Sequence, residues 1–147
     1  MSCYTTFFII SNEDFRKLRE DESMSIDAAK SAIELISINS RGDFAALTDG
    51  MYKFDCYTEV NKSHWDKIYS NYTDLKNDLK NRLERCEAVY NRLTSREELE
   101  DICDEMEDIK QNLSILESYK DKLGMVFDML EDIAWRKSDY TIIVYEG

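Results

Sequence analysis

Residues 65–130 read WDKIYSNYTDLKNDLKNRLERCEAVYNRLTSREELEDICDEMEDIKQNLSILESYKDKLGMVFDML and carry the clearest pattern in the chain. In each half, an apolar or aromatic side chain recurs every seven residues, and a second apolar series lies between these positions. A repeat of about 3.5 residues is typical of a coiled coil. Thr94-Ser95 separates the two halves. We therefore predict two long helices that fold back on each other as an antiparallel hairpin.

The predicted seam fixes a register for this hairpin. Its first helix contributes Trp65, Ile68, Tyr72, Leu75, Leu79, Cys86, Val89 and Leu93, and its second contributes Leu99, Ile102, Met106, Ile109, Leu113, Leu116, Leu123, Phe127 and Leu130. Arg82 and Lys120 are the exceptions to the apolar series. In this register Leu79 faces Leu113 and Cys86 faces Met106. We expect an arm about 45 Å long, with the second helix overrunning it to pack on the rest of the protein.

Capping residues mark the predicted helix starts. Ser63 with Asp66 and Ser95 with Glu98 match the capping box, in which a Ser or Thr is followed three residues later by an acid. Gly124 is expected to mark a kink, because glycine weakens a helix interior by about 1 kcal/mol.

Strand-like segments lie on both sides of the hairpin. Residues 3–10 and 140–145 are rich in aromatic and β-branched side chains, which predicts two strands lying in one sheet. Residues 44–47 and 51–60 flank Asp49-Gly50, a signal for a β-hairpin. The segment between the first strand and this hairpin predicts two short helices, one capped by Ser11 and one running from Ile26 to Ile36.

Together these segments predict one α+β domain. A small, mostly antiparallel sheet, made of the terminal strands and a β-hairpin, carries two short helices and a long antiparallel coiled-coil-like helical hairpin. Residues 1–62 and 136–147 form the α+β head, and residues 63–135 form the helical hairpin. A chain of 147 residues is long enough to bury a core without disulfides or metals.

Charge, apolar segments and cysteines limit which partners the chain could bind and in which compartment it could act. The net charge of −12 argues against direct binding to nucleic acid or to an anionic membrane, both of which require clustered Lys and Arg. No segment has the length of apolar sequence that a membrane span needs, and no secretory leader is recognised. The four cysteines do not form a disulfide framework. We expect a cytoplasmic protein.

Signals for catalysis are sparse. His64 is the only histidine, and no motif places a Ser or Cys beside it. The chain has no zinc or calcium motif, no phosphate-binding loop and no dinucleotide fingerprint, so we expect no metal and no cofactor. The chain is expected not to be an enzyme; the alternative is a small enzyme with its site in the head, around His64.

One acidic run stands out from the rest of the chain. Residues 96–135 hold 13 acidic and four basic side chains, which is −9 of the net −12. Eight acids occur within residues 97–108, on predicted outward positions, with Arg82, Arg85 and Arg92 on the partner helix as partial balance: Glu97, Glu98, Glu100, Asp101, Asp104, Glu105, Glu107 and Asp108. Charge runs on long helices usually serve solubility, and that reading stays open.

The leading functional hypothesis is a non-enzymatic protein that binds another protein. In size and charge the chain is similar to proteins that inhibit restriction or CRISPR enzymes by mimicking DNA, although no motif is shared. The eight acids would then occupy a basic surface on a nucleic-acid-handling enzyme. The alternative is a self-associating scaffold, in which two hairpins pair into a four-helix bundle through residues that flank the seam: Tyr69, Tyr90, Ile115 and Tyr119.

Overall fold

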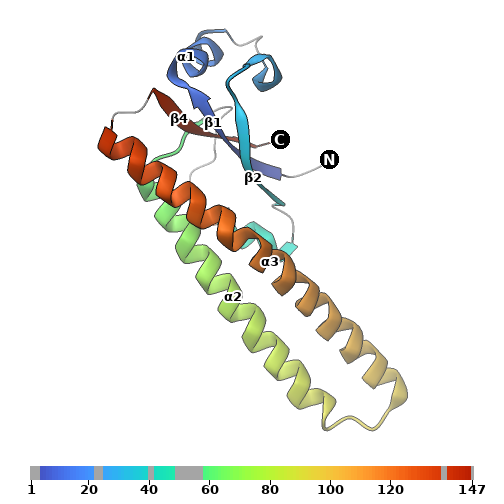
Figure 1. The fold of residues 1–147 in the computed structure, drawn as a ribbon. Coiled ribbons are helices and arrows are strands. Elements are labelled where there is room, and N and C mark those ends of the chain that lie inside the picture. Colours follow the sequence, from blue (N-terminus) through green and yellow to red (C-terminus); the bar gives the residue numbers. More distant parts are fainter. Residues whose placement is uncertain (1–3, 22–24, 40–41, 49–57, 137–138, 147) are drawn as a thin grey trace.

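A computed structural model describes the chain except for residues 1–3, 22–24, 40–41, 49–57, 137–138 and 147. The strands are β1 (Tyr4–Ser11), β2 (Ile33–Asn39), β3 (Thr58–Glu59) and β4 (Tyr140–Glu146). The α-helices are α1 (Asn12–Glu20), α2 (Lys62–Tyr90) and α3 (Arg96–Arg136), and two 3₁₀ segments are η1 (Ile26–Ala28) and η2 (Gly42–Thr48). The predicted α+β class is confirmed, with a long helical hairpin joined to a small sheet (Figure 1).

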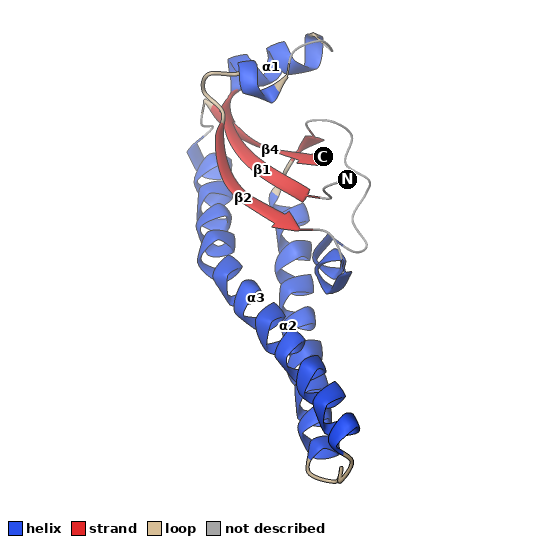
Figure 2. Cartoon of the chain, turned by 90° about the vertical axis from the view of Figure 1, so that its right-hand side faces the viewer, coloured by secondary structure: helices blue, strands red, loops and turns tan. Residues whose placement is uncertain are grey.

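The sheet has the strand order β2-β1-β4-β3, and every neighbouring pair is antiparallel. The two terminal strands lie side by side, as predicted, with Phe7 opposite Val144. Side chains that alternate along a strand point to opposite faces. Phe7 and Val144 accordingly enter the core shared with α2 and α3, while Ile10 and Ile143 enter a smaller core with α1. Figure 2 shows the sheet between α1 and the helical hairpin.

The long hairpin follows the predicted pattern. The ion pairs Lys62–Glu131 (3.2 Å) and Lys76–Glu117 (3.4 Å) join α2 to α3 and are consistent with the predicted register, in which Leu79 faces Leu113. In α3, the series Ile109, Leu116, Leu123 and Leu130 is buried, whereas the other predicted series is only partly buried. Near the sheet, α3 also contacts β2 and β4, which is the predicted overrun.

The predicted second short helix, Ile26 to Ile36, is wrong. Only Ile26–Ala28 forms a turn of 3₁₀ helix, and Ile33–Asn39 forms the edge strand β2. The register between β1 and β2 shifts between Phe7 and Phe8, so Leu35 and Ile36 are buried in succession. A bulge of this kind breaks the alternation expected of a strand and leaves a spacing that resembles a helix.

The predicted β-hairpin over residues 44–60 is also wrong. Residues 44–47 lie in the 3₁₀ segment η2, and β3 pairs with β4 instead. Asp49-Gly50 and residues 51–57 lie outside the described residues. Asp43 explains the place of η2, because its carboxylate accepts hydrogen bonds from Arg82 of α2 (3.0 Å) and Asn112 of α3 (3.2 Å).

The start of α2 differs from prediction by two residues. Asn61, and not Ser63, is the N-cap: its side chain accepts from the His64 N–H (2.9 Å), and His64 Nδ1 accepts from the Asn61 N–H (3.3 Å). The lone histidine thus closes a capping box, a role that Glu or Gln usually plays.

Asn61→Ala should therefore lower the free energy of unfolding by about 1 kcal/mol, because it leaves helix N–H groups without an acceptor. Ser63→Ala is the matched control and should change it by less than about 0.5 kcal/mol. Urea denaturation followed by circular dichroism measures both. A larger loss for Ser63→Ala would contradict the observed start of α2.

The start of α1 is capped, and it is also hydrogen-bonded to the segment that follows the helix. Ser11 is the N-cap of α1, as predicted. The Asp14 carboxylate accepts from the hydroxyl and from the N–H of Ser31. The two Ser31 hydrogen bonds are the main cause that lowers the pKa of Asp14 below its usual value.

This hydrogen bonding predicts a pH dependence. The pKa of Asp14 is lower in the folded protein than in the unfolded chain. The ionised carboxylate therefore adds to the free energy of unfolding above the unfolded pKa, and this contribution is lost as pH falls through the folded pKa. Ser31→Ala should raise the Asp14 pKa, as measured by NMR titration of the carboxyl carbon. The difference in free energy of unfolding between the unmodified protein and Ser31→Ala should become smaller as pH falls through the folded-state pKa of Asp14. An unchanged Asp14 pKa in Ser31→Ala would contradict this assignment.

Candidate functional site: the acidic tip of the helical hairpin

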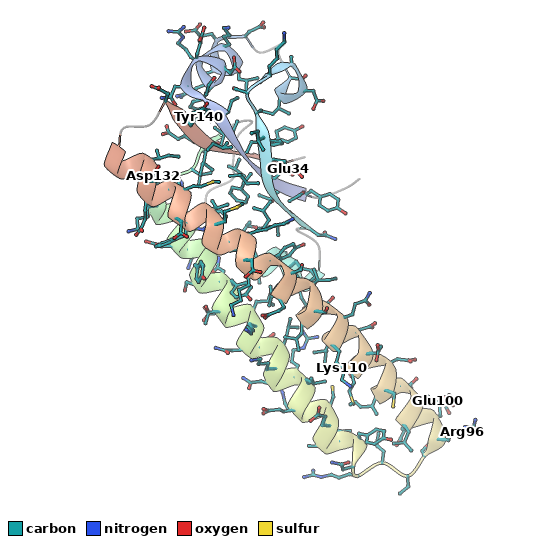
Figure 3. The ribbon with its side chains drawn as sticks, viewed as in Figure 1. Glu34, Arg96, Glu100, Lys110, Asp132 and Tyr140 are labelled. Carbon is teal, nitrogen blue, oxygen red and sulfur yellow. The ribbon has the colours of Figure 1, made fainter. Side chains whose placement is uncertain are left out.

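The eight predicted contact acids all lie at the end of the hairpin furthest from the sheet. Figure 3 labels Arg96 and Glu100 at this end and Asp132 at the opposite end of α3, near the head. We call residues 97–108 of α3 the acidic tip. All eight acids are exposed, as the heptad pattern predicted: Glu97, Glu98, Glu100, Asp101, Asp104, Glu105, Glu107 and Asp108.

Few positive charges balance the acidic tip. Among the described residues, Glu100 is the member of the eight that forms an ion pair, with Arg96 (3.3 Å) on the same helix. Arg82, expected to offset the acids, pairs instead with Asp43 (3.0 Å) and Asp78 (3.9 Å). The ion pairs of Arg82 are thus made with η2 and α2, and the exposed carboxylates of the tip are left to interact mainly with solvent.

The spacing of the acids follows from helix geometry. Residues three and four apart lie on one face, with Cβ atoms about 5–6 Å apart. Glu97, Asp101, Asp104 and Asp108 form such a stripe. Each adjacent pair repels, because exposed like charges at this spacing cost a helix about 0.2–0.5 kcal/mol. The tip therefore concentrates negative charge along one line at a cost in helix stability.

The helices are also less well buried at the tip. No α3 side chain before Ile109 is buried, and the last buried residue of α2 is Cys86. Val89 and Tyr90 are 43% and 42% exposed. In the described part of the chain no third element lies beside this end of the hairpin (Figure 1), so its packing there is between α2 and α3.

The four residues predicted for self-association lie at different points along the hairpin and differ in their contacts. Tyr90 lies at the tip, and Tyr69 lies near the head, where its ring is 6.3 Å from that of Phe127. Tyr119 is only partly exposed and contacts Phe44 of η2 in an edge-to-face arrangement (6.2 Å). Ile115 is 36% exposed. Tyr119 thus has a structural partner that the sequence pattern did not identify.

The described cysteines are free thiols in different surroundings. Cys86 is buried, and burial is the main cause that raises the pKa of its thiol, with nearby Glu105 adding to the effect. A raised pKa disfavours the reactive thiolate. Cys103 is exposed. Cys3 and Cys56 lie outside the described residues.

No cluster of three or more His, Cys, Asp or Glu side chains suited to a metal ion occurs in the described part of the chain. Within the same residues, no helix combines the length and apolar character needed to cross a bilayer. Comparisons with protein-family models, curated proteins and solved structures found no match.

Neutralising the centre of the tip should stabilise the protein. Asp101→Asn with Asp104→Asn removes several like-charge pairs and should raise the free energy of unfolding by about 1 kcal/mol at low salt. The gain should shrink at about 0.5 M NaCl, where screening is strong. The matched control is Asp27→Asn with Glu34→Gln, which removes two exposed acids elsewhere. Urea denaturation at both salt concentrations checks this, and equal effects of the two pairs would contradict it.

Proposed function

We propose that this chain is a non-catalytic protein that acts in the cytoplasm by binding another protein through the acidic tip. The partner surface is basic and ordinarily binds nucleic acid, so that occupation by the tip inhibits the partner. The observation that supports this proposal is the placement of eight exposed acids, mostly without ion pairs, at the far end of a long helical hairpin.

The geometry of the tip suits a phosphate-binding groove for a physical reason. Acidic residues whose Cβ atoms lie about 5–6 Å apart along one helix face resemble successive phosphates along a nucleic-acid strand. A hairpin also places these charges far from the bulk of the head, where they can enter a concave surface. The repulsion between neighbouring acids of the tip would be offset when Lys and Arg side chains of the partner bind beside them.

Affinity capture with matched baits tests this function. The tip variant carries Glu97→Gln, Asp101→Asn, Asp104→Asn and Asp108→Asn. The control bait carries Glu20→Gln, Asp27→Asn, Glu34→Gln and Asp74→Asn, which changes the net charge equally at exposed sites outside the tip. Both baits and the unmodified protein are incubated with host lysate, washed at low and then high salt, and analysed by mass spectrometry.

The proposal predicts that nucleic-acid-binding proteins are retained at low salt by the unmodified and control baits and released at high salt. The tip variant should lose at least about 90% of this capture, because electrostatic association depends on the local charge. Added single- or double-stranded DNA should compete for the same partner. Equal capture by the tip variant and the control bait would overturn the proposal.

Self-association is the second candidate, and the exposure of Val89 and Tyr90 favours it. A second hairpin would cover these side chains in a four-helix bundle. Tyr90→Asp is the appropriate variant, since Tyr119→Asp would also disturb the contact with Phe44. Sedimentation at high salt separates the candidates: a dimer that Tyr90→Asp dissociates supports the scaffold, and a monomer excludes it.

A further inference from the structure

A second surface of the hairpin lies at the other end of α3, near the head. Here α2 and α3 border an open groove with a volume of about 670 Å³, continuous with a second hollow of about 430 Å³ through Tyr69, Gly124 and Asp128. We call this the foot groove. Its remaining lining residues are Asp66, Lys120, Asp121, Met125, Phe127, Met129 and Asp132.

The floor of the foot groove is apolar. Tyr69 and Met125 are 38% and 41% exposed. Phe127 and Met129 are partly buried beside them. Gly124 deepens the groove, because a Cβ atom added there would meet no other atom within 4 Å. Aromatic and Met side chains of this kind suit the docking of another apolar side chain.

The rim of the foot groove is acidic. Four carboxylates line it, from Asp66 on α2 and from Asp121, Asp128 and Asp132 on α3. The basic lining residue, Lys120, lies 3.9 Å from Glu117. Within the described residues, no ion pair is formed by Asp66, Asp121 or Asp128.

One further observation concerns Phe127, which lines the groove. Lys62 Nζ lies 5.4 Å from the centre of the Phe127 ring, so this aromatic side chain already accepts a cation within the fold. An apolar floor and an acidic rim together point to an occupant with both apolar and cationic groups.

We propose that the foot groove binds a short cationic amphipathic helix of a partner protein, with its apolar face on Tyr69, Met125 and Phe127 and its Lys or Arg side chains against the aspartates. The acids on α3 extend from Asp121 to Asp132, a distance of about 16 Å along the helix, which three turns of a partner helix would match. Such a helix would complete a three-helix arrangement at the foot of the hairpin. A second copy of this acidic chain is a poorer occupant because its net charge is −12.

The foot groove shares no residue with the acidic tip. The eight acids of the tip lie on exposed positions of α3, whereas the foot groove combines an apolar floor with an acidic rim. Loss of binding at one surface therefore leaves the other testable.

Fluorescence anisotropy with two labelled peptides provides the test. One peptide of about 14 residues has Lys and Leu on opposite helical faces, and the other carries Ser in place of every Leu. Two pairs of protein variants accompany them. Gly124→Leu fills the groove while Gly124→Ala leaves most of it open, and both replace a residue that disfavours helix. Asp121→Asn with Asp128→Asn is matched by Asp27→Asn with Asp74→Asn at exposed sites outside the groove.

The proposal predicts that the Lys/Leu peptide binds at least about tenfold more tightly than the Lys/Ser peptide. Gly124→Leu should weaken binding about tenfold and Gly124→Ala less than about threefold, because only the larger side chain occupies the apolar floor. The Asp121/Asp128 pair should weaken binding about fivefold or more, and the control pair less than about twofold. Circular dichroism checks that every variant retains its helix content.

Three results would overturn the proposal. Equal binding of the two peptides would show that charge alone drives association. Unchanged binding by Gly124→Leu would place the peptide elsewhere on the protein. A homodimer in sedimentation that Gly124→Leu dissociates would make a second copy the occupant of the groove.

Discussion

Trp65 joins the three parts on which the fold depends. Its ring is fully buried and packs edge-to-face on Phe7 of β1, with centroids 5.0 Å apart. Its indole N–H donates to the Leu123 carbonyl of α3 at 2.9 Å, and the residue itself belongs to the first turn of α2. One side chain therefore holds the sheet, the start of α2 and the later part of α3 in contact. Large aromatic side chains dominate core energetics, and a buried indole requires such a polar partner.

The two ends of the hairpin differ in how well their side chains are buried, because only one end lies near Trp65. At the foot, the sheet and η2 cover the helices, and Asp43 links Arg82 and Asn112 across both of them. Towards the tip, no other element among the described residues covers the two helices, and the burial of side chains falls on both of them. The fold thus separates a packed base, which contains the foot groove, from a projecting end that carries the densest run of acidic side chains in the sequence.

The parts of the fold that could be predicted were those with a long, uniform pattern. The heptads identified both long helices and their register, and the composition of the terminal segments identified β1 and β4. The bulge at Leu35 hid β2, because one extra residue makes its buried positions resemble those of a helix. Asp49-Gly50 suggested a local hairpin, yet β3 pairs with the distant β4, a choice set by tertiary packing. His64 was recognised as the only histidine, but its role as a cap partner depends on the helix starting at Asn61.

The candidate sites also differ in whether they follow from a sequence pattern or depend on tertiary packing. Exposure of the acidic tip follows directly from the heptad positions, so its eight acids could be placed from the sequence. The foot groove could not, since it combines Asp66 and Tyr69 of α2 with residues of α3 that are far away in the chain. Gly124 was expected to mark a kink, which stays a prediction; that its missing side chain leaves open space at the groove could not be seen from the sequence. Tyr119 fitted a surface pattern, and its contact with η2 was invisible without the fold.

Hydrogen exchange along α2 and α3 tests most directly whether packing around Trp65 divides the hairpin into a stable foot and a less stable tip. Amides open locally with free energies that range from near zero up to that of global unfolding. This account predicts that amides near Trp65 and Leu123 exchange only through global unfolding, while those near Tyr90 and Leu99 exchange at least about a hundredfold faster. Uniform protection along both helices would contradict it, because the tip would then be as firmly held as the foot.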